Sequence, residues 1–208
     1  NFLATNPEFV KTALETKGTS IQQGIQNLLE DLRKGRISMT DDSAFEVGRN
    51  LAITPGAVVF ENELMQLLQY SPQTEKVAAR PFLMVPPCIN KYYILDLQPE
   101  NSVVRYAVEQ GNTVFLVSWR NVQADNGHKT WDDYIEKGAL TAIKAVREIC
   151  KVDQINALGF CVGGTILGSA LSVARQRGEN PVASLTLLTT LLDFSETGDI
   201  SVFIDRDF

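Results

Sequence analysis

The stretch at residues 159–165 (GFCVGGT) constrains the fold of this chain more than any other part of the sequence. An apolar run, residues 155–160, leads into it, and a run with helical character, residues 165–177, leads out of it. The order is that of a strand, a sharp turn and a helix, with Cys161 at the apex. An apex residue sits in a strained backbone conformation, so we expect Gly159 and Gly163 to let the helix close against the strand.

The pattern G-x-C-x-G-G in this setting is typical of the nucleophile elbow of α/β-hydrolases, with cysteine in place of serine. We expect the turn to lift Cys161 to the carboxyl end of the sheet, where the start of the helix favours a thiolate. The alternative is a buried structural thiol, since free cysteine packs as a small apolar residue. A P-loop and a dinucleotide-binding fingerprint are excluded, because no lysine follows the glycines and no G-x-G-x-x-G occurs.

The charge balance and the sparse cysteines limit the class of protein. The chain has 19 basic and 25 acidic residues, a formal charge of −6, which argues against nucleic-acid binding. Its three cysteines, Cys88, Cys150 and Cys161, do not form a disulfide framework, which indicates reduced thiols in a cytoplasm. No apolar run is long enough for a membrane span, no signal peptide is visible, and no metal site is predicted.

Two helices are predicted before any strand. Asn6 and Pro7 suit the start of a helix that runs to about Lys17, and a second helix runs from about Thr19 to Gly35. The second helix carries apolar residues at helical spacing, and docking on the main domain and docking on a partner explain them equally well. Residues 36–54 are polar and turn-rich. We therefore predict a helical N-terminal segment, residues 1–40, followed by the catalytic domain, residues 41–208.

Strands and helices alternate over the rest of the chain. A hairpin is predicted at residues 57–60 and 65–70, and further strands at 82–85, 113–118, 155–160 and 182–188. Helices are predicted at 101–110, 131–150 and 165–177. This alternation predicts right-handed βαβ units in a mostly parallel sheet, with the 182–188 strand as an exposed edge. The predicted fold class is α/β, an α/β-hydrolase fold.

The chain resembles polyhydroxyalkanoate synthases, in particular the class I type that acts on short-chain substrates. The matching stretches are spread over nearly all of its 208 residues. The most specific are PPCINKYYILDLQPENS and GFCVGG, and the others are NFLATNPEFV, DDSAFEVGRNLAITPGAVVFEN, LLQYSP, TVFLVSWRN, TWDDYI and LTLLTTLLDF. The family links (R)-3-hydroxyacyl units, delivered as coenzyme A thioesters such as 3-hydroxybutyryl-CoA, into a polyester and releases coenzyme A.

The resemblance implies that Cys161 is the nucleophile that carries the acyl unit or the growing chain, which agrees with thioester exchange at a thiolate. It implies no cofactor, because the coenzyme A thioester is the substrate. It also implies a homodimer, a cytoplasmic location at the surface of polyhydroxyalkanoate granules, and contact with granule-associated proteins.

Three further residues are expected near the nucleophile. In this fold the oxyanion donors are the N–H after the nucleophile and an N–H of the loop after the third strand. By position these are the N–H groups of Val162 and Ile89. Cys88 is expected in the pocket wall, with a core thiol as the alternative.

The expected acid and base are not found where the fold would place them. α/β-Hydrolases have the order nucleophile, acid, histidine, and family members carry the aspartate and histidine well downstream. The single histidine, His128, precedes Cys161, so we predict a solvated loop residue, and Asp193 suits a turn. We therefore expect the fold to be incomplete at the C-terminus and this polypeptide to lack full activity.

Two other functions fit the pattern. A cysteine-type hydrolase of esters or lactones would use the same elbow, and a non-catalytic fragment would bind a partner or granule through its helical segment. Lys91 and Arg120 suit coenzyme A phosphates, although surface solvation explains them more simply.

Overall fold

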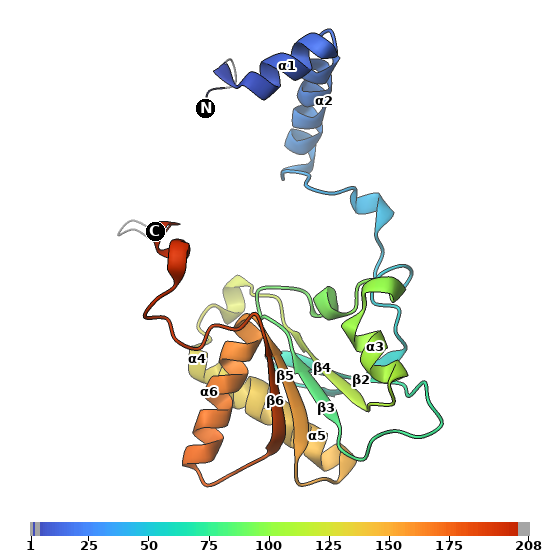
Figure 1. Cartoon of the computed structure of the whole chain (residues 1–208), viewed down its shortest axis with the longest axis vertical. Helices are drawn as coiled ribbons and strands as arrows, with labels where there is room; N and C mark the ends of the chain where they lie inside the picture. Colours follow the sequence, from blue (N-terminus) through green and yellow to red (C-terminus); the bar gives the residue numbers. More distant parts are fainter. Residues whose placement is uncertain (1, 3–4, 204–208) are drawn as a thin grey trace. The chain divides into compact units, whose positions relative to one another are not determined.

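The computed structural model describes residues 2 and 5–203 and divides the chain into two compact units (Figure 1). The first unit is Asn1–Glu46 and the second is Val47–Phe208. The predicted catalytic domain extends to residue 208, but residues 204–208 lie outside the described part.

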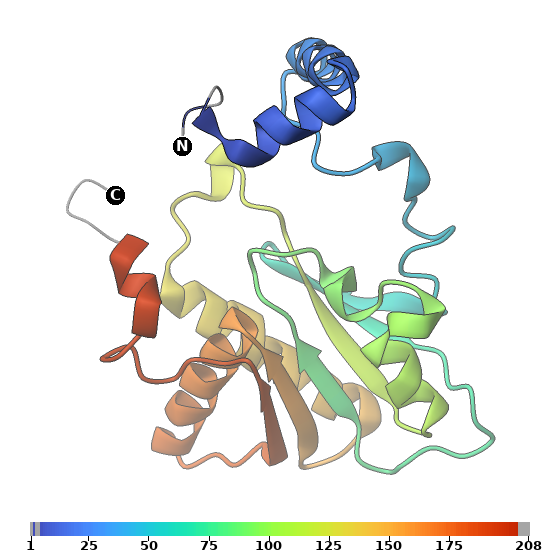
Figure 2. The ribbon, with the colours of Figure 1, turned by 45° about the horizontal axis from the view of Figure 1, so that its top comes forward.

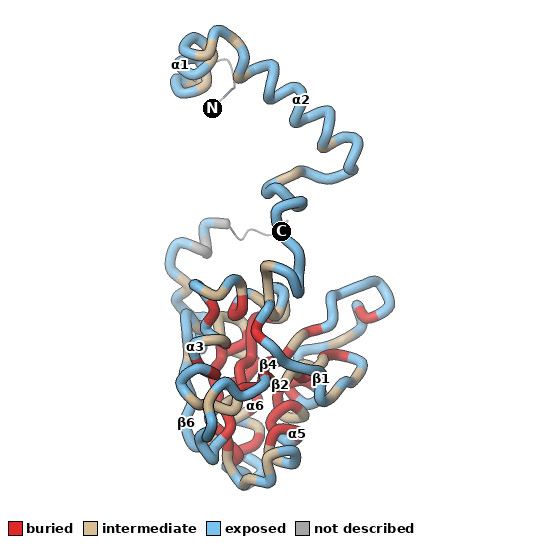
Figure 3. The backbone as a smooth tube through the Cα atoms, turned by 90° about the vertical axis from the view of Figure 1, so that its right-hand side faces the viewer, coloured by how far each residue is buried: buried red, intermediate tan, exposed pale blue. Residues whose placement is uncertain are grey.

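The first unit contains helices α1 (Pro7–Glu15) and α2 (Thr19–Lys34) and a short 3-10 helix, Asp42–Ala44. The Asn6 side chain accepts a hydrogen bond from the Glu8 N–H at 3.0 Å, so the predicted cap is confirmed, although α1 ends before Lys17. Gly35 ends α2 in the left-handed conformation. Neither helix has a buried residue, and the tube is pale blue or tan along both (Figure 3). The exposed residues of α2 include its large apolar ones: Ile21, Ile25, Leu28, Leu29 and Leu32.

The second unit contains a six-stranded sheet in the order β1-β2-β4-β3-β5-β6. The hairpin β1–β2 is antiparallel, and β2 also pairs antiparallel with β4, whereas β3, β4, β5 and β6 run parallel to one another. All six predicted strands are present, with shifts of one residue at some ends. Their bounds are β1 Gly56–Glu61, β2 Met65–Tyr70, β3 Phe82–Val85, β4 Val114–Trp119, β5 Ile155–Phe160 and β6 Val182–Leu188.

Helices cover both faces of the sheet (Figure 2). Alternating residues of the buried strands point to opposite faces, as the two-residue period requires. Leu83 and Val85 of β3 belong to the core under α5 (Thr141–Cys150) and α6 (Val162–Gln176). Met84 belongs to the second core, which packs under α3 (Val103–Glu109).

The helix predicted at residues 131–150 is not uniform. It begins as α4 (Trp131–Asp133), continues as a π-helix at Tyr134–Leu140 and ends as α5. Gly138 lies against the Trp119 ring, where an added Cβ would be 2.6 Å from a ring carbon. The Thr141 hydroxyl also donates to the Glu136 carbonyl, five residues back, at 2.7 Å. Both contacts are made within or directly after the π-helical segment.

Short 3-10 helices connect the main elements: Tyr92–Leu95, Pro99–Asn101, Ala124–Asn126 and Gly198–Phe203. The Tyr92–Leu95 segment therefore does not continue the sheet. Among the described residues β6 pairs only with β5, and most of its residues are exposed, so the predicted edge is confirmed. No described helix is both long and apolar enough to cross a membrane.

Candidate active site

Cys161 occupies the turn between β5 and α6. Its backbone angles, φ 52° and ψ −126°, form a conformation that few residues other than glycine adopt. Its N–H donates to the Leu188 carbonyl at 2.9 Å, and its own carbonyl accepts the Gly164 N–H at 2.9 Å. The thiol is half-buried and stands at the first turn of α6, where helix geometry leaves N–H groups without intrahelical partners. The predicted strand, turn and helix are therefore confirmed.

Three glycines make the turn possible. A Cβ on Gly159 would lie 2.3 Å from the Gly164 Cα, so Gly159 lets α6 close on β5 as predicted. Gly163 has a different role from the predicted one, because its Cβ would lie 2.2 Å from the Val85 carbonyl oxygen at the end of β3. A Cβ on Gly164 would lie 2.0 Å from the Thr190 hydroxyl oxygen. The elbow is thus packed against its own strand and against both neighbouring strands.

The contact at Gly163 brings the loop after β3 to the elbow. Pro86 follows β3 directly, and its carbonyl accepts a hydrogen bond from the Trp119 indole at 2.8 Å. The chain then turns, with the Asn90 N–H donating to the Pro87 carbonyl at 3.2 Å. Ile89 lies in this turn and is 75% exposed, while Val162 packs against the core under α5 and α6. The loop and the first turn of α6 therefore adjoin through their backbones.

Cys88 belongs to this loop and lies close to Tyr134 of the π-helix. Its side chain is half-buried against the core, and burial raises the pKa of its thiol. Burial raises the pKa of Tyr134, and the electrostatic interaction with Cys88 raises it to a lesser extent. The centre of the Tyr134 ring lies 5.4 Å from that of the Trp119 ring. Burial also raises the pKa of Cys150, which packs against the same core.

The polar residues considered for other roles have local partners or lie in solvent. Arg120 pairs with Asp125 at 2.7 Å, and the Lys91 ammonium donates to the Asn121 side-chain oxygen at 2.8 Å. His128 is exposed in the loop after β4. Asp193 accepts the Ser195 N–H at 2.9 Å, which lowers its pKa and matches the predicted turn.

An ion network that the sequence did not reveal connects the β1–β2 turn to the π-helix. Glu63 pairs with Lys129 at 2.6 Å and with Lys137 at 2.7 Å, and Lys137 also pairs with Asp133 at 3.0 Å. Hydrogen bonds from the two lysines lower the pKa of Glu63 to about 2. Hydrogen bonds from the Thr130 N–H and from Lys137 lower the pKa of Asp133 to about 2.

A buried carboxylate, also not anticipated, follows the 3-10 helix Tyr92–Leu95. Asp96 is 2% exposed, and one of its oxygens accepts the hydroxyls of Thr54 and Ser102, each at 2.6 Å. Ser102 in turn caps α3 by accepting the Arg105 N–H at 2.9 Å. Asp96 thus joins the segment before β1 to the start of α3. The sequence signal was only the match to LDLQPENS, which says nothing about burial.

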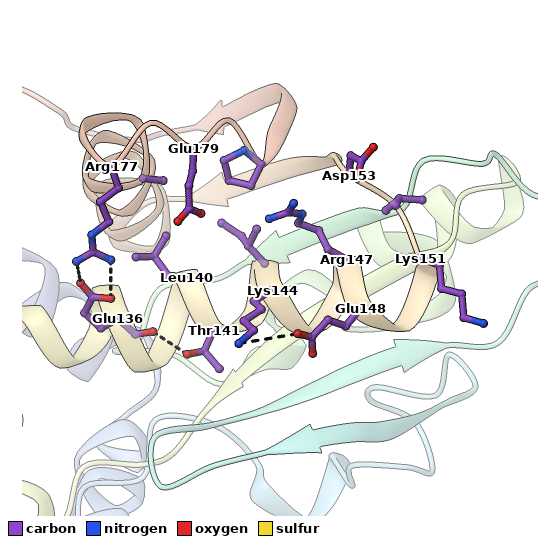
Figure 4. Close-up of a pocket in the computed structure, with 14 residues that line it drawn as sticks. Glu136, Leu140, Thr141, Lys144, Arg147, Glu148, Lys151, Asp153, Arg177 and Glu179 are labelled. Carbon is purple, nitrogen blue, oxygen red and sulfur yellow. Dashed lines mark hydrogen bonds and ion pairs between the residues drawn. The ribbon is translucent and has the colours of Figure 1, made fainter.

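A groove of about 690 Å³ lies between α5 and the C-terminal half of α6 (Figure 4). Its lining includes Ala174, 13 residues along the helix from Cys161, a separation of roughly 20 Å at 1.5 Å per residue. Arg177 and Glu136 form a two-pronged ion pair at its rim. Basic and acidic side chains line the groove in equal number, so its charge favours neither sign: Lys144, Arg147, Lys151, Arg177, Glu136, Glu148, Asp153 and Glu179. It is separate from the elbow.

A smaller cavity of about 350 Å³ lies between the β1–β2 turn and the end of β4, and its lining is Glu61, Asn62, Met65, Gln66 and residues 118–121. No group of three or more histidine, cysteine, aspartate or glutamate side chains that could hold a metal ion occurs among the residues described.

Two family models match the chain. The model of the poly-beta-hydroxybutyrate polymerase (PhaC) N-terminus matches residues 1–107, and that of the alpha/beta hydrolase fold matches residues 81–208. Together they cover the whole chain.

Curated relatives agree with these matches. The chain is 65% identical over 206 residues to a poly(3-hydroxyalkanoate) polymerase subunit PhaC of Cupriavidus necator, covering 99% of this chain and 35% of that protein. It is 41% identical over 211 residues to the subunit PhaC of Rhizobium meliloti, covering 100% of this chain and 34% of that protein. The chain therefore spans about a third of the length of these relatives.

Among solved structures, the crystal structure of EstE5, soaked with p-nitrophenyl butyrate, superposes with a TM-score of 0.53 at 14% identity. The match covers 74% of this chain and 49% of that one. At this identity it supports the α/β-hydrolase fold alone, in agreement with the predicted fold class.

Proposed function

Since the chain belongs to the poly-beta-hydroxybutyrate polymerase (PhaC) family, we propose that it is the part of an acyltransferase that carries the nucleophile. Cys161 transfers (R)-3-hydroxyacyl units, such as 3-hydroxybutyryl, from coenzyme A to a growing polyester. The observation that carries this proposal is the placement of the Cys161 thiol at a strained apex, at the start of α6.

The reaction proceeds by two acyl transfers, first from coenzyme A to the Cys161 sulfur and then from that sulfur to a hydroxyl oxygen. The Cys161 sulfur attacks the substrate carbonyl, the carbon–sulfur bond to coenzyme A breaks, and coenzyme A leaves as its thiol after taking a proton. The hydroxyl oxygen of another unit then attacks the enzyme thioester and loses its proton, and the Cys161 sulfur is released as a carbon–oxygen ester bond forms. A cysteine thioester remains reactive enough for this second attack, which favours transfer over hydrolysis if water is excluded.

Each attack produces an oxyanion that needs preorganised donors. We propose the N–H groups of Val162 and Ile89, with Cys88 in the adjoining pocket wall. The packing of Gly163 on the end of β3 supports this choice, because it brings the two backbone segments together. Losing one such donor typically lowers the rate by ~10²–10³.

Proton transfer limits what these residues can do by themselves. The single histidine, His128, is exposed after β4, on the wrong side of Cys161 in chain order for this fold. We therefore propose that residues 1–208 alone release little coenzyme A from 3-hydroxybutyryl-CoA, whereas the full-length protein that carries them does so. Robust turnover by residues 1–208 would show that the base lies within them.

The family membership also motivates proposals about the setting of the reaction. We propose a homodimer in the cytoplasm, at the surface of polyhydroxyalkanoate granules and in contact with granule-associated proteins. The reaction as written needs no cofactor besides the coenzyme A thioester substrate.

The test is to replace Cys161 by alanine in the full-length protein, with C150A as the matched control. We expect C161A to form no polymer and no acyl adduct detectable by intact mass after rapid quenching, whereas C150A keeps both. Polymer formation by C161A would refute the proposal. Free 3-hydroxy acid as the main product of the unmodified protein would favour the hydrolase alternative.

Alkylation addresses the non-catalytic alternative without any substrate. Burial raises the pKa of the Cys88 and Cys150 thiols, so both should react slowly. We expect iodoacetamide to modify Cys161 first in the folded protein, as read by peptide mass spectrometry. Modification of all three thiols at one rate would speak against an activated nucleophile.

A further inference from the structure

The residues that follow β6 surround the elbow on the side away from β3. β5 and β6 pair up to Phe160 and Leu188, and the next residue on each strand, Cys161 and Thr189, has a positive φ, of 52° and 44°. Such a conformation is unfavourable for a β-branched residue and persists only where its surroundings impose it. Two strained residues therefore stand side by side at the carboxyl edge of the sheet.

The Leu188 carbonyl receives two hydrogen bonds. The Cys161 N–H donates to it at 2.9 Å, and the Thr190 hydroxyl donates to it at 3.1 Å. The same hydroxyl oxygen lies 3.4 Å from the Gly159 carbonyl oxygen, on β5. Thr190 thus fixes the direction of the carbonyl that holds the nucleophile's own amide.

The Thr190 side chain also fills the space beside Gly164. A Cβ on Gly164 would lie 2.0 Å from the Thr190 Oγ1, 2.7 Å from its Cγ2 and 2.9 Å from its Cβ. The Thr165 hydroxyl extends this contact by donating to the Leu191 carbonyl at 2.8 Å. The first turn of α6 is therefore held by the segment after β6 as well as by its own strand.

We infer that Thr190 is a positioning residue for the proposed acyl transfer, and that its hydroxyl sets the placement of Cys161 and the Val162 N–H through the Leu188 carbonyl. This inference rests on the proposed function. Small displacements of reacting groups cost large factors in rate, so losing one hydroxyl here should affect turnover more than substrate binding.

Two substitutions in the full-length protein separate the hydroxyl from the shape of the side chain. T190V keeps the shape and removes the donor, whereas T190S keeps the donor. We expect T190V to lower kcat by about 10-fold with KM changed less than about twofold, and T190S to stay within about twofold of the unmodified protein. The control is S172A, which removes an exposed hydroxyl from α6; this hydroxyl donates to the Gly168 carbonyl at 2.9 Å.

The alkylation rate of Cys161 reports positioning without substrate. We expect iodoacetamide to modify Cys161 at least about threefold more slowly in T190V, because the sulfur is held less well at the start of α6, and at an unchanged rate in S172A. Melting temperatures are measured in parallel, so that loss of folded protein is not taken for loss of positioning. An unchanged kcat and alkylation rate in T190V would overturn the inference, as would equal effects in S172A.

A compensating pair tests the contact itself. G164A should abolish turnover, and the double variant G164A/T190G should recover folded protein with measurable alkylation at Cys161, because the three atoms nearest to the added Cβ all belong to the Thr190 side chain. G163A cannot be rescued in this way, since its clashes are with backbone. Failure of the double variant to fold would contradict the proposed contact.

The two proposals fail in different ways. If C161A still forms polymer, the proposed function is wrong, but the alkylation rates in T190V and T190S still show whether Thr190 positions the sulfur. If C161A is inactive and T190V behaves as the unmodified protein, only the positioning role is wrong.

Discussion

The two compact units contain glycines in opposite surroundings. A Cβ added at Gly24, inside α2, would meet nothing within 4 Å, whereas one added at Gly163 would lie 2.2 Å from the Val85 carbonyl oxygen. The same residue type is therefore a local weakness in one helix and a requirement for packing at the start of another. The G-x-C-x-G-G motif predicted a packing role for Gly163, but it did not show that the neighbouring segment would be the end of β3.

The contrast extends to burial. Neither α1 nor α2 has a buried residue, whereas α6 has six, among them both Gly163 and Gly164. Caps and periodicity thus account for the helices of the first unit, while packing decides the shape of the elbow. The same kind of change should have opposite signs in the two units.

The largest effect is expected from G163A. The new methyl group would meet backbone atoms of Val85 and Pro86 that cannot move without displacing β3, so we expect a loss of about 3 kcal/mol or more in the free energy of unfolding. Urea unfolding measures this loss. A G163A protein as stable as the unmodified chain would show that the close approach of α6 to β3 is not needed.

A smaller effect is expected from N6A at the start of α1. Removing the side chain that accepts the Glu8 N–H should cost about 1 kcal/mol of local helix stability and leave the second unit unchanged. Hydrogen exchange should show about fivefold lower protection of α1 amides only. Lower protection in β3 or β5 would mean that the two units are energetically coupled.

The opposite sign is expected from G24A. Because nothing lies within 4 Å of the added Cβ, alanine should stabilise α2 by about 0.5–1 kcal/mol. Protection of α2 amides should rise about two- to fivefold. A decrease would mean that a partner or another segment approaches α2 closely in solution.

The smallest effect concerns the surface ion network of the second unit. The folded-state pKa of Glu63 is lowered to about 2, so its contribution to stability is present above the ordinary carboxyl pKa and is lost as pH falls towards 2. We expect E63Q to lower stability slightly at pH 7 and to flatten its dependence on pH between about 4.5 and 2. The comparison is by thermal melts across this range, and identical pH profiles would show that the pairs with Lys129 and Lys137 contribute nothing.

Much of the fold could be read directly from the residues. The apolar runs before Cys161, the change of period after residue 54 and the glycines around the apex predicted the strands and the elbow to within one or two residues. These features are local: a buried parallel strand needs a run of apolar residues, and a helix needs a cap and a 3.6-residue period. The caps at Asn6 and Gly35 follow for the same reason.

What only the tertiary structure decided depends on contacts between distant segments. The π-helix at residues 134–140 forms where Gly138 meets Trp119, and the Asp96 carboxylate gains its partners from residues 42 positions before and 6 after it. Thr190 meets Gly164 from the segment that follows β6. The periodicity of the sequence does not predict such contacts, because they depend on how the sheet brings the ends of its strands together. The sequence determined that a cysteine stands at a strained turn, and the packing of β3, β5 and β6 around that turn decided what holds it there.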